Sequence, residues 1–472
     1  MCKIQKTINV GTVSKHQRKA ARKRGGKLNE YSLAGLGIGG VIGAGYFLGS
    51  GLAVREAGPS VSLAFLIGSL LMMQVLGAMT SINVNRLQQG SFRVYIEHFL
   101  GQYAGFLIGW ALFVSSILAI GSEAIAMGVF AHYWLPKVPL PVLAIVFMAV
   151  IIVLNAMNME IFGPIESGMA VVKVAALIAF IAVGAWVLFT QNGMAARNPF
   201  SSPHAFFPKG ISGLLQSMLV VIFSFSGISA VAMASTEVAK PRIQIPRAAG
   251  IMAFGSIGLY VLSMLVLVML TAWNTVSVHK SPFVHALDVI GMSGAASFFN
   301  IVILLAAFSV MAASYYTSVQ LIVSLSEAKK GPHLFLRHAK NGLYRYAWLT
   351  AGAGCLLVVG LSFLLPAALY NYLVSASSYI TFLNWALNLI TFLVWRKKRS
   401  EHETYQSKLI WGVPGAYASL FAIMVLFVMS LRVADFRMGF YAALCFFLLI
   451  TAAYAVWKKA GRRTEQKTPE ST

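Results

Sequence analysis

The organisation of this chain is most visible in the stretch Gly37-Ile38-Gly39-Gly40-Val41-Ile42-Gly43-Ala44-Gly45-Tyr46-Phe47-Leu48-Gly49-Ser50-Gly51. It lies inside the first long apolar segment and contains seven glycines. A helix in lipid must satisfy its backbone groups internally, and each glycine weakens a helix by about 1 kcal/mol relative to alanine. The stretch therefore predicts an unwound backbone that lines a cavity. The alternative is close helix packing through the small-residue spacing of Gly35, Gly39 and Gly43.

The composition is that of an all-α integral membrane protein. Apolar residues make up 58% of the 472 residues and charged residues only 11%, against about 25% in a typical soluble domain. The three cysteines give neither a disulfide framework nor a metal pattern. We find no phosphate-binding loop and no nucleophile elbow in the sequence. We therefore expect no enzyme activity, no cofactor and no metal.

Twelve apolar segments are each close to the roughly 20 residues that a helix needs to cross a bilayer. We predict spans near 32–54, 59–82, 103–131, 140–157, 165–189, 212–236, 247–273, 284–325, 347–365, 370–395, 411–430 and 438–457. The segment 284–325 includes a loop-like entry.

The formal charge of +23 follows the topology of these spans. With the N-terminus inside, 29 of the 37 Lys and Arg residues fall in inside segments and 7 in outside loops. This asymmetry predicts a multi-pass protein of the cytoplasmic membrane, with cytoplasmic tails at 1–30 and 458–472. It explains the basic charge without a nucleic acid partner. The run Lys15–Arg24 either lies against anionic membrane lipids or acts only as a topology determinant.

A second interruption is predicted in span 6, at Phe223-Ser224-Phe225-Ser226-Gly227-Ile228-Ser229. If spans 1–5 (31–190) and spans 6–10 (211–395) are two repeats, both interruptions fall in the first helix of a repeat. An odd number of spans makes the repeats inverted, with spans 11 and 12 (411–457) appended. Paired interruptions of this kind indicate a transport site, and the alternative for span 6 is an ordinary packed helix.

Unwound backbone can recognise an amino acid without charged side chains. Free amides near Gly43, Ala44 and Gly45 suit a carboxylate. Exposed carbonyls, including those near Phe223 and Ser226, suit an ammonium group, with Phe223 and Phe225 as walls.

Three acidic or basic residues need separate explanations. Lys173 lies about eight residues inside span 5, where burial favours proton exchange by the amine; snorkelling to the surface is the alternative. Glu123 in span 3 is a proton relay, a substrate partner or a structural acceptor. Glu237, at the end of span 6, is better explained as a solvated charge in a basic loop. Ser309, Ser314 and Ser318 of span 8 are further residues that could face the site.

At these residues the chain resembles an amino acid permease of the amino acid–polyamine–organocation superfamily. Gly37–Gly51 is similar to that family's first-span motif, and Phe223–Gly227 with Glu237 and Pro241–Ala248 is similar to its sixth-span motif and following loop. The resemblance also covers Glu123 with Tyr133–Pro136, and Val172–Val174 with Ala179–Ile181; overall it extends over roughly residues 28–460.

The resemblance implies a LeuT-type inverted repeat of five plus five helices, with helices 1 and 6 discontinuous, and two extra spans. It implies a substrate carboxylate at the amides of Ala44 and Gly45. The substrate amino group would meet carbonyls near Val41, Phe223 and Ser226, with Phe223 or Phe225 as an aromatic gate. Lys173 matches the lysine that replaces a sodium ion in proton-coupled relatives. Ser229 stands where many relatives have an acidic residue, which weakens a cationic-substrate interpretation.

We therefore expect an importer of an amino acid, coupled to protons, with a lean toward a substrate with a neutral side chain. An exchanger on the same fold is the alternative, followed by a nutrient receptor built on a transporter scaffold or a channel.

Overall fold

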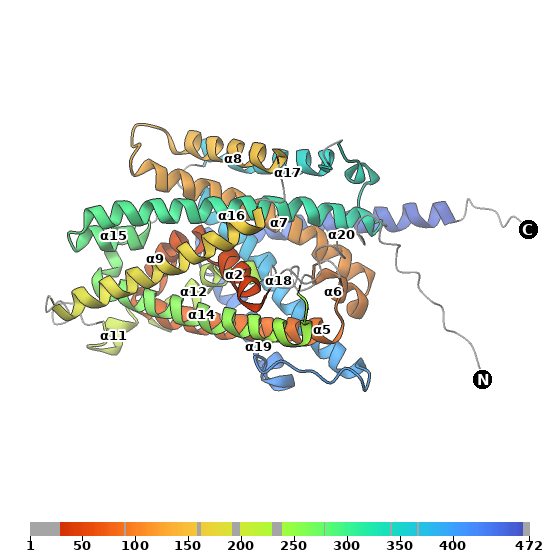
Figure 1. Ribbon diagram of the computed structural model, residues 1–472, viewed down its shortest axis with the longest axis horizontal. Helices are drawn as coiled ribbons and strands as arrows, with labels where there is room; N and C mark the ends of the chain where they lie inside the picture. Colours follow the sequence, from red (N-terminus) through yellow and green to blue (C-terminus); the bar gives the residue numbers. More distant parts are fainter. Residues whose placement is uncertain are drawn as a thin grey trace, which may run out of the picture.

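The structure, a computed structural model, describes residues 29–88, 91–157, 162–190, 199–228, 238–277, 279–339, 342–365 and 368–465. Regular secondary structure in these ranges is helical, without a β-strand element. The long helices run side by side along the molecule (Figure 1): α5 (Val61–Asn85), α7 (Gln102–His132), α8 (Leu140–Met157), α9 (Phe162–Thr190), α12 (Gly210–Phe223), α14 (Pro241–Leu270), α16 (Ser293–Glu327), α17 (Arg345–Gly360), α18 (Leu369–Lys398), α19 (Gly412–Ser430) and α20 (Ala434–Glu465).

Ten helical stretches in the described ranges are long and apolar enough to cross a membrane, and Leu140–Ala156 is a shorter apolar helix. One of the ten, Ala44–Asn85, contains 42 residues and covers the second part of the predicted span 32–54 and all of the predicted span 59–82. The all-helical membrane fold is thus confirmed, while the count of twelve spans and the repeat boundaries stay predictions.

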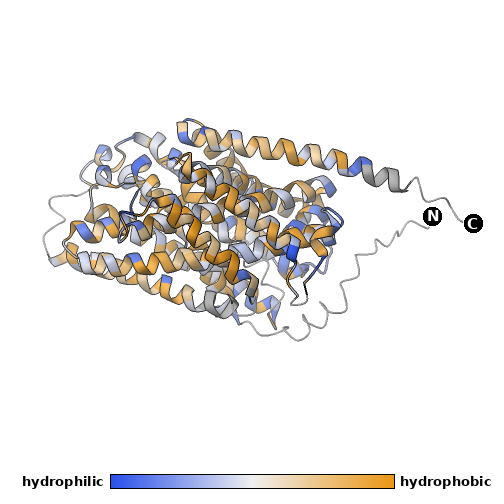
Figure 2. Cartoon of the chain, turned by 90° about the horizontal axis from the view of Figure 1, so that it is seen from above, coloured by the Kyte–Doolittle hydropathy of each residue, from blue (hydrophilic) through white to orange (hydrophobic). Residues whose placement is uncertain are grey.

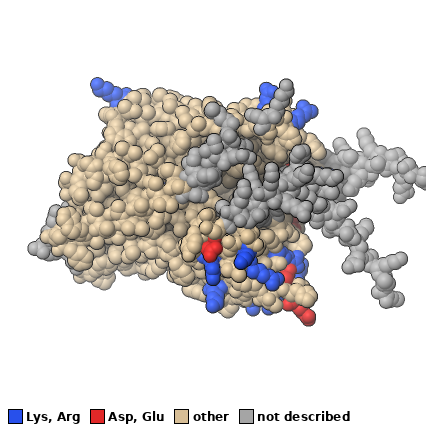
Figure 3. Space-filling view, viewed as in Figure 1, with Lys and Arg blue, Asp and Glu red and all other residues tan. Residues whose placement is uncertain are grey.

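The outer surface of the bundle is apolar along its length. Figure 2 shows hydrophobic residues along the helices and hydrophilic residues mostly toward the ends. On the face shown in Figure 3, the visible Lys, Arg, Asp and Glu residues also lie toward the ends. Phe189 of α9 and Val456 of α20 are 78% and 68% exposed. Helices that are apolar on all sides, including the outward one, are typical of membrane spans.

The first helix of the bundle is interrupted within the glycine-rich stretch. Helix α2 (Glu30–Val41) ends where Ile42 and Gly43 take extended conformations, and α3 (Ala44–Phe47) begins directly after them. Helix α4 (Gly49–Ala57) continues the chain to Gly58, whose φ is +64°. A Cβ there would lie 2.4 Å from Cγ of Pro208, so only glycine fits this turn into α5.

The helix of the second interruption is α12, which ends at Phe223. Ser224 and Phe225 form a turn, and a short 3₁₀ helix, η3 (Ser226–Ile228), follows. A Cβ on Gly227 would lie 2.1 Å from the carbonyl oxygen of Gly40. The two interruptions therefore touch through their backbones. The expectations about Ser229 and Glu237 concern residues outside the described ranges.

The predicted segment 284–325 contains two helices. Helix α15 (Pro282–Val289) is separated from α16 by a turn at Gly291, whose φ is +82°. This corresponds to the predicted loop-like entry. A short helix that the sequence analysis did not identify, α6 (Arg93–Leu100), lies between α5 and α7.

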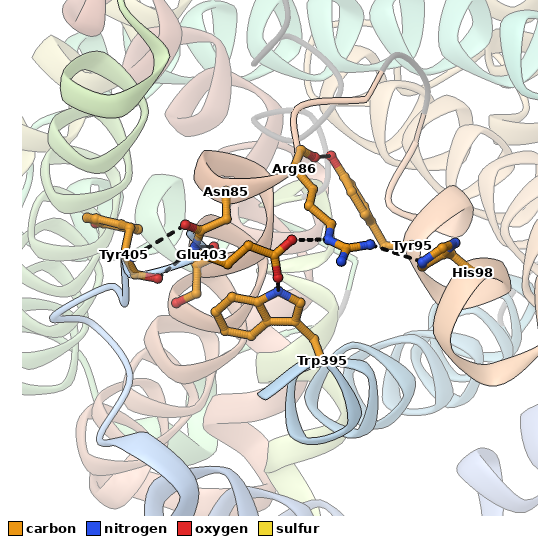
Figure 4. Close-up of polar contacts among 8 residues, drawn as sticks. Asn85, Arg86, Tyr95, His98, Trp395, Glu403 and Tyr405 are labelled. Carbon is orange, nitrogen blue, oxygen red and sulfur yellow. Dashed lines mark hydrogen bonds and ion pairs between the residues drawn. The ribbon is translucent and has the colours of Figure 1, made fainter. Parts of the chain in front are cut away.

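The loop after α18 is fastened to the end of α5 (Figure 4). Arg86 forms an ion pair with Glu403, and the indole Nε1 of Trp395 donates to the other carboxylate oxygen at 3.0 Å. Asn85 donates through Nδ2 to the carbonyl oxygen of Tyr405 at 2.7 Å. The contacts of Arg86 and Asn85 tie this loop, which is far away in sequence, to the end of α5, and the contact of Trp395 ties it to α18.

Helix α6 is attached to the same point. The Tyr95 hydroxyl donates to the carbonyl oxygen of Arg86 and accepts from the amide of Gln88 at 2.9 Å. His98 contacts the Arg86 guanidinium at 3.0 Å. Burial raises the pKa of the Tyr95 phenol to about 12, against the opposing effect of the Gln88 amide. The phenol therefore stays protonated and keeps donating at neutral pH.

We expect Glu403→Ala to destabilise the protein, because it leaves both the Arg86 guanidinium and the Trp395 indole without their acceptor. A buried donor left unsatisfied costs about 1–3 kcal/mol, so the midpoint of thermal unfolding in detergent should fall. Glu401→Ala, at an exposed position of the same loop, is the control. Equal midpoints for the two variants would contradict the role given to Glu403.

Candidate functional site

The broken end of α2 exposes carbonyl groups, and side chains from other helices bind them. A helix leaves its last four carbonyls without intrahelical partners. The carbonyl of Gly39 accepts from Nζ of Lys173 on α9 at 2.8 Å, and the carbonyl of Val41 accepts from the hydroxyl of Tyr260 on α14 at 3.1 Å. Lys173 is fully buried. Its ammonium therefore lies inside the bundle, and the snorkelling alternative is wrong.

The start of α3 is bound in a complementary way. The amide of Ala44 donates to both carboxylate oxygens of Glu123, at 3.1 and 3.0 Å. The carbonyl of Ala44 accepts from the hydroxyl of Tyr370 at 3.1 Å, and that of Gly45 accepts from Oγ of Ser224 at 2.9 Å. Backbone groups at the start of α3 thus meet polar side chains of α7, α18 and the second interruption.

A cavity of about 220 Å³ adjoins both interruptions. Four of the predicted binding residues line it: Val41, Gly45, Phe223 and Ser226. One of the two predicted coupling residues, Glu123, also lines it. Phe223 lies directly against Gly45, since a Cβ there would be 2.8 Å from the phenylalanine ring. Ala44 contributes its amide to Glu123 and is not part of the lining.

The cavity continues from the interruptions along three helices. Its further lining carries mostly small or hydroxyl-bearing side chains, among them Ser115 and Ser116 of α7, Ser314, Thr317 and Ser318 of α16, and Ser377, Thr381 and Asn384 of α18. It reaches Ser91, just beyond the end of α5. Of the three serines considered in span 8, Ser314 and Ser318 line the cavity, whereas Ser309 donates to the carbonyl of Ala306.

The opposite side of the interruptions is filled by aromatic rings. Tyr46 and Tyr260 stack with ring centroids 3.8 Å apart, and Phe65 packs edge-on against both. Phe225 belongs to this cluster, with its ring 5.1 Å from that of Tyr260, and it does not line the cavity. Phe65 lies near the start of α5 and Ser91 beyond its end. The cluster and the cavity therefore extend in opposite directions.

Several residues at the interruptions and the cavity were not predicted from the sequence. Tyr260, Tyr370 and Ser224 bind the exposed carbonyls, and Ser377 and Asn384 line the cavity. A signal existed for Tyr260, because a phenol in the middle of an apolar span needs a hydrogen-bond partner. Among the described residues no group of three His, Cys, Asp or Glu side chains is arranged to hold a metal ion.

The fold is similar to that of a solved membrane transporter. The manganese transporter of Eremococcus coleocola, solved in complex with an aromatic bis-isothiourea substituted compound, aligns with a TM-score of 0.54. The alignment covers 97% of this chain and 98% of that one, at 13% identity. At this identity the likeness concerns the fold alone.

Sequence comparison gives the family. The chain is 30% identical over 426 residues to the uncharacterized amino acid permease YvbW of Bacillus subtilis (strain 168), covering 89% of this chain and 94% of that one. It is 31% identical over 396 residues to the gamma-aminobutyric acid permease of the same organism, covering 82% and 84%. It is 30% identical over 411 residues to the aromatic amino acid transport protein AroP of Escherichia coli O6:H1, covering 86% and 90%. The family model "Amino acid permease" matches residues 34–467, and the chain belongs to this family of membrane transport proteins.

Proposed function

We propose that this protein imports an amino acid across the cytoplasmic membrane in symport with protons. The observation that carries the proposal is the cavity of about 220 Å³ that both helix interruptions border. The printed names of similar proteins support an amino acid as substrate, because they include an aromatic amino acid transport protein and a gamma-aminobutyric acid permease. The two relatives are named for different substrates, so their names support amino acids as the class of substrate and do not indicate a particular side chain.

The backbone of the interruptions would hold the two charged groups of the substrate. We assign the carboxylate to the amides of Ala44 and Gly45, which suit an anion. We assign the ammonium to the carbonyls of Val41, Phe223 and Ser226. A carbonyl oxygen has two acceptor sites, so the hydrogen bond from Tyr260 leaves one site on Val41 for this role. Phe223 would form the wall next to Gly45, and Phe225 would support the gate from the aromatic cluster.

The lining supports a substrate with a neutral side chain. Among the lining residues in the described part of the chain, Glu123 is the one with a formal charge; the others are small, apolar or hydroxylated, apart from the neutral amide of Asn384. A cationic or anionic side chain would have to be desolvated there without an opposite charge dedicated to it.

Lys173 and Glu123 are the groups we assign to proton coupling. Both are buried, and each binds one side of the first interruption: Lys173 the carbonyl of Gly39, Glu123 the amide of Ala44. A change of charge on either group would alter a backbone contact of the broken helix. In this way a proton could bias the position of α2 or α3.

The direction of the cavity supports an inward-facing state. The cavity reaches Ser91, in a loop that the distribution of Lys and Arg assigns to the cytoplasm. The aromatic cluster around Tyr46 and Tyr260 would then close the outer side. The repeat boundaries at 31–190 and 211–395, the extra spans at 411–457 and the two cytoplasmic tails belong to the same proposal.

The test is uptake of a panel of radiolabelled amino acids into proteoliposomes that contain the purified protein. We expect one subset to accumulate under an imposed inward proton gradient, and a protonophore should abolish this accumulation. Protein-free liposomes are the control. Uptake that needs a preloaded amino acid and ignores the gradient would show an exchanger instead. Binding without uptake would show a receptor.

A further inference from the structure

In this structure, a carboxylate already occupies the amide of Ala44, which we have assigned to the substrate. Both oxygens of Glu123 lie within hydrogen-bond distance of that amide, at 3.1 and 3.0 Å. The Glu123 residue is 5% exposed and still lines the cavity that adjoins the interruptions. The Glu123 side chain thus makes the same contact with the Ala44 amide that the carboxylate of a bound amino acid would make.

The contact between Glu123 and the Ala44 amide depends on the absence of a side chain at Gly43. A Cβ on Gly43 would lie 2.7 Å from Oε1 of Glu123 and 3.2 Å from the nearest methyl group of Val310. Any larger residue at this position would push the carboxylate away from the amide. A hydrogen bond to an ionised acceptor is roughly twice as strong as a neutral one, so a charged Glu123 holds the amide far better than a protonated one.

We infer that Glu123 is an internal substitute for the substrate carboxylate, and that the two groups exchange on the Ala44 amide with the transfer of one proton. When the substrate binds, Glu123 takes up a proton, becomes a neutral acid and gives up the amide. When the substrate leaves, Glu123 releases the proton and binds the amide again. This inference rests on the proposed function and specifies how its site is coupled.

The proton is required because both carboxylates cannot share this position while ionised. Like charges within about 4–6 Å favour protonation of one of them. Uptake of one proton by Glu123 leaves the total charge of the two acids at −1, the same as that of Glu123 alone.

The exchange also defines the chemical class of the ligand. A ligand must carry a free carboxylate to replace Glu123, so an ester or an amide of the same amino acid should bind poorly.

Titratable groups from three neighbouring helices surround this exchange. The phenols of Tyr260 on α14 and Tyr370 on α18 donate to the carbonyls of Val41 and Ala44, on the two sides of the interruption that Glu123 binds. The ammonium of Lys173 on α9 binds the Gly39 carbonyl, four residues before Gly43. Helix α16 contributes Val310 and hydroxyl groups to this region. Lys173 is therefore the other group that could carry the proton, and the experiment must separate it from Glu123.

The experiment is calorimetric titration of the full-length protein in lipid nanodiscs with its best substrate amino acid. Repeating the titration in buffers of different ionisation enthalpy gives the number of protons taken up per bound substrate. We expect a value close to one for the wild type. Its affinity should rise about tenfold for each unit that the pH falls, over the range in which ligand-free Glu123 is ionised.

The decisive variant is Glu123→Gln, which keeps the shape of the side chain and has no charge to neutralise. We expect it to bind the substrate without proton uptake and with an affinity that does not change over that pH range. Ser122→Ala is the control, because Ser122 is the neighbouring buried residue and its hydroxyl bonds to the carbonyl of Ala119 in its own helix. This control should keep both the proton uptake and the pH dependence.

Two results would overturn the inference. One is substrate binding to the wild type with no proton uptake. The other is uptake of one proton by both the wild type and Glu123→Gln, which would place the proton on another group such as Lys173. Either result leaves the proposed function standing if the amino acid still accumulates under a proton gradient. Failure of every amino acid to bind or accumulate would reject the proposed function itself.

Discussion

Replacing Gly227 with alanine is expected to reduce transport by more than about tenfold, because the two helix interruptions would then collide. The new Cβ would lie 2.1 Å from the carbonyl oxygen of Gly40, 2.4 Å from its carbonyl carbon and 2.9 Å from the amide nitrogen of Val41. These are backbone atoms, which cannot move aside as the tip of a side chain can. Overpacking of this kind typically costs about 1–3 kcal/mol, and sometimes more.

The strain of Gly227→Ala would act between the two parts of the binding site. We expect substrate uptake to fall by more than about tenfold, the equivalent of 1.4 kcal/mol, as measured in proteoliposomes with equal amounts of folded protein. Gly35→Ala is the matched control, because Gly35 lies on α2 with nothing within 4 Å of its added Cβ. Normal uptake by a well-folded Gly227→Ala variant would mean that the interruptions do not need this close approach.

Lys173→Ala is expected to remove proton-driven accumulation. The substitution takes away the ammonium that binds the carbonyl of Gly39 at 2.8 Å, at a fully buried position. The carbonyl then loses a charge-assisted hydrogen bond, and the last turn of α2 loses this polar link to α9. We expect the ratio of inside to outside substrate to approach one under an imposed gradient.

Exchange should survive in the Lys173→Ala variant if the binding site keeps its shape. Uptake against preloaded substrate, measured in the same proteoliposomes, tests this. Lys137→Ala removes an exposed lysine and should behave as the wild type. Accumulation by Lys173→Ala with normal pH dependence would reject the coupling role and leave Lys173 as a structural cation.

The sequence indicated where the backbone departs from regular helix. The glycines of Gly37–Gly51 and the small residues after Phe223 indicated where regular helix would fail, and helices α2 and α12 end at Val41 and Phe223. The intramembrane charges Lys173 and Glu123 were identified because an ionisable group is costly in lipid and needs a partner. These signals are local, so a single sequence is enough to find them.

The partners of the interruptions could not be predicted in the same way. That Tyr260, Tyr370 and Glu123 meet the first interruption depends on which faces of α14, α18 and α7 turn toward α2 and α3. All of these helices are apolar on most sides, so periodicity does not reveal the inward face. For the same reason, the sequence did not show that Phe225 lies in the aromatic cluster and not at the cavity. A choice between two aromatic residues only two positions apart requires the conformation of the turn between them.

Tyr260 belongs to the aromatic cluster and also binds the first interruption, and in the proposed transport cycle this has a consequence for timing. Its ring stacks on Tyr46 at 3.8 Å, and its hydroxyl donates to the carbonyl of Val41 at 3.1 Å. If α14 withdraws the ring to open the aromatic side, the hydroxyl must leave the carbonyl in the same movement. Val41 would then regain its full acceptor capacity at the moment when substrate can enter from that side. A single movement of Tyr260 would thus open the aromatic side and free the Val41 carbonyl for the substrate.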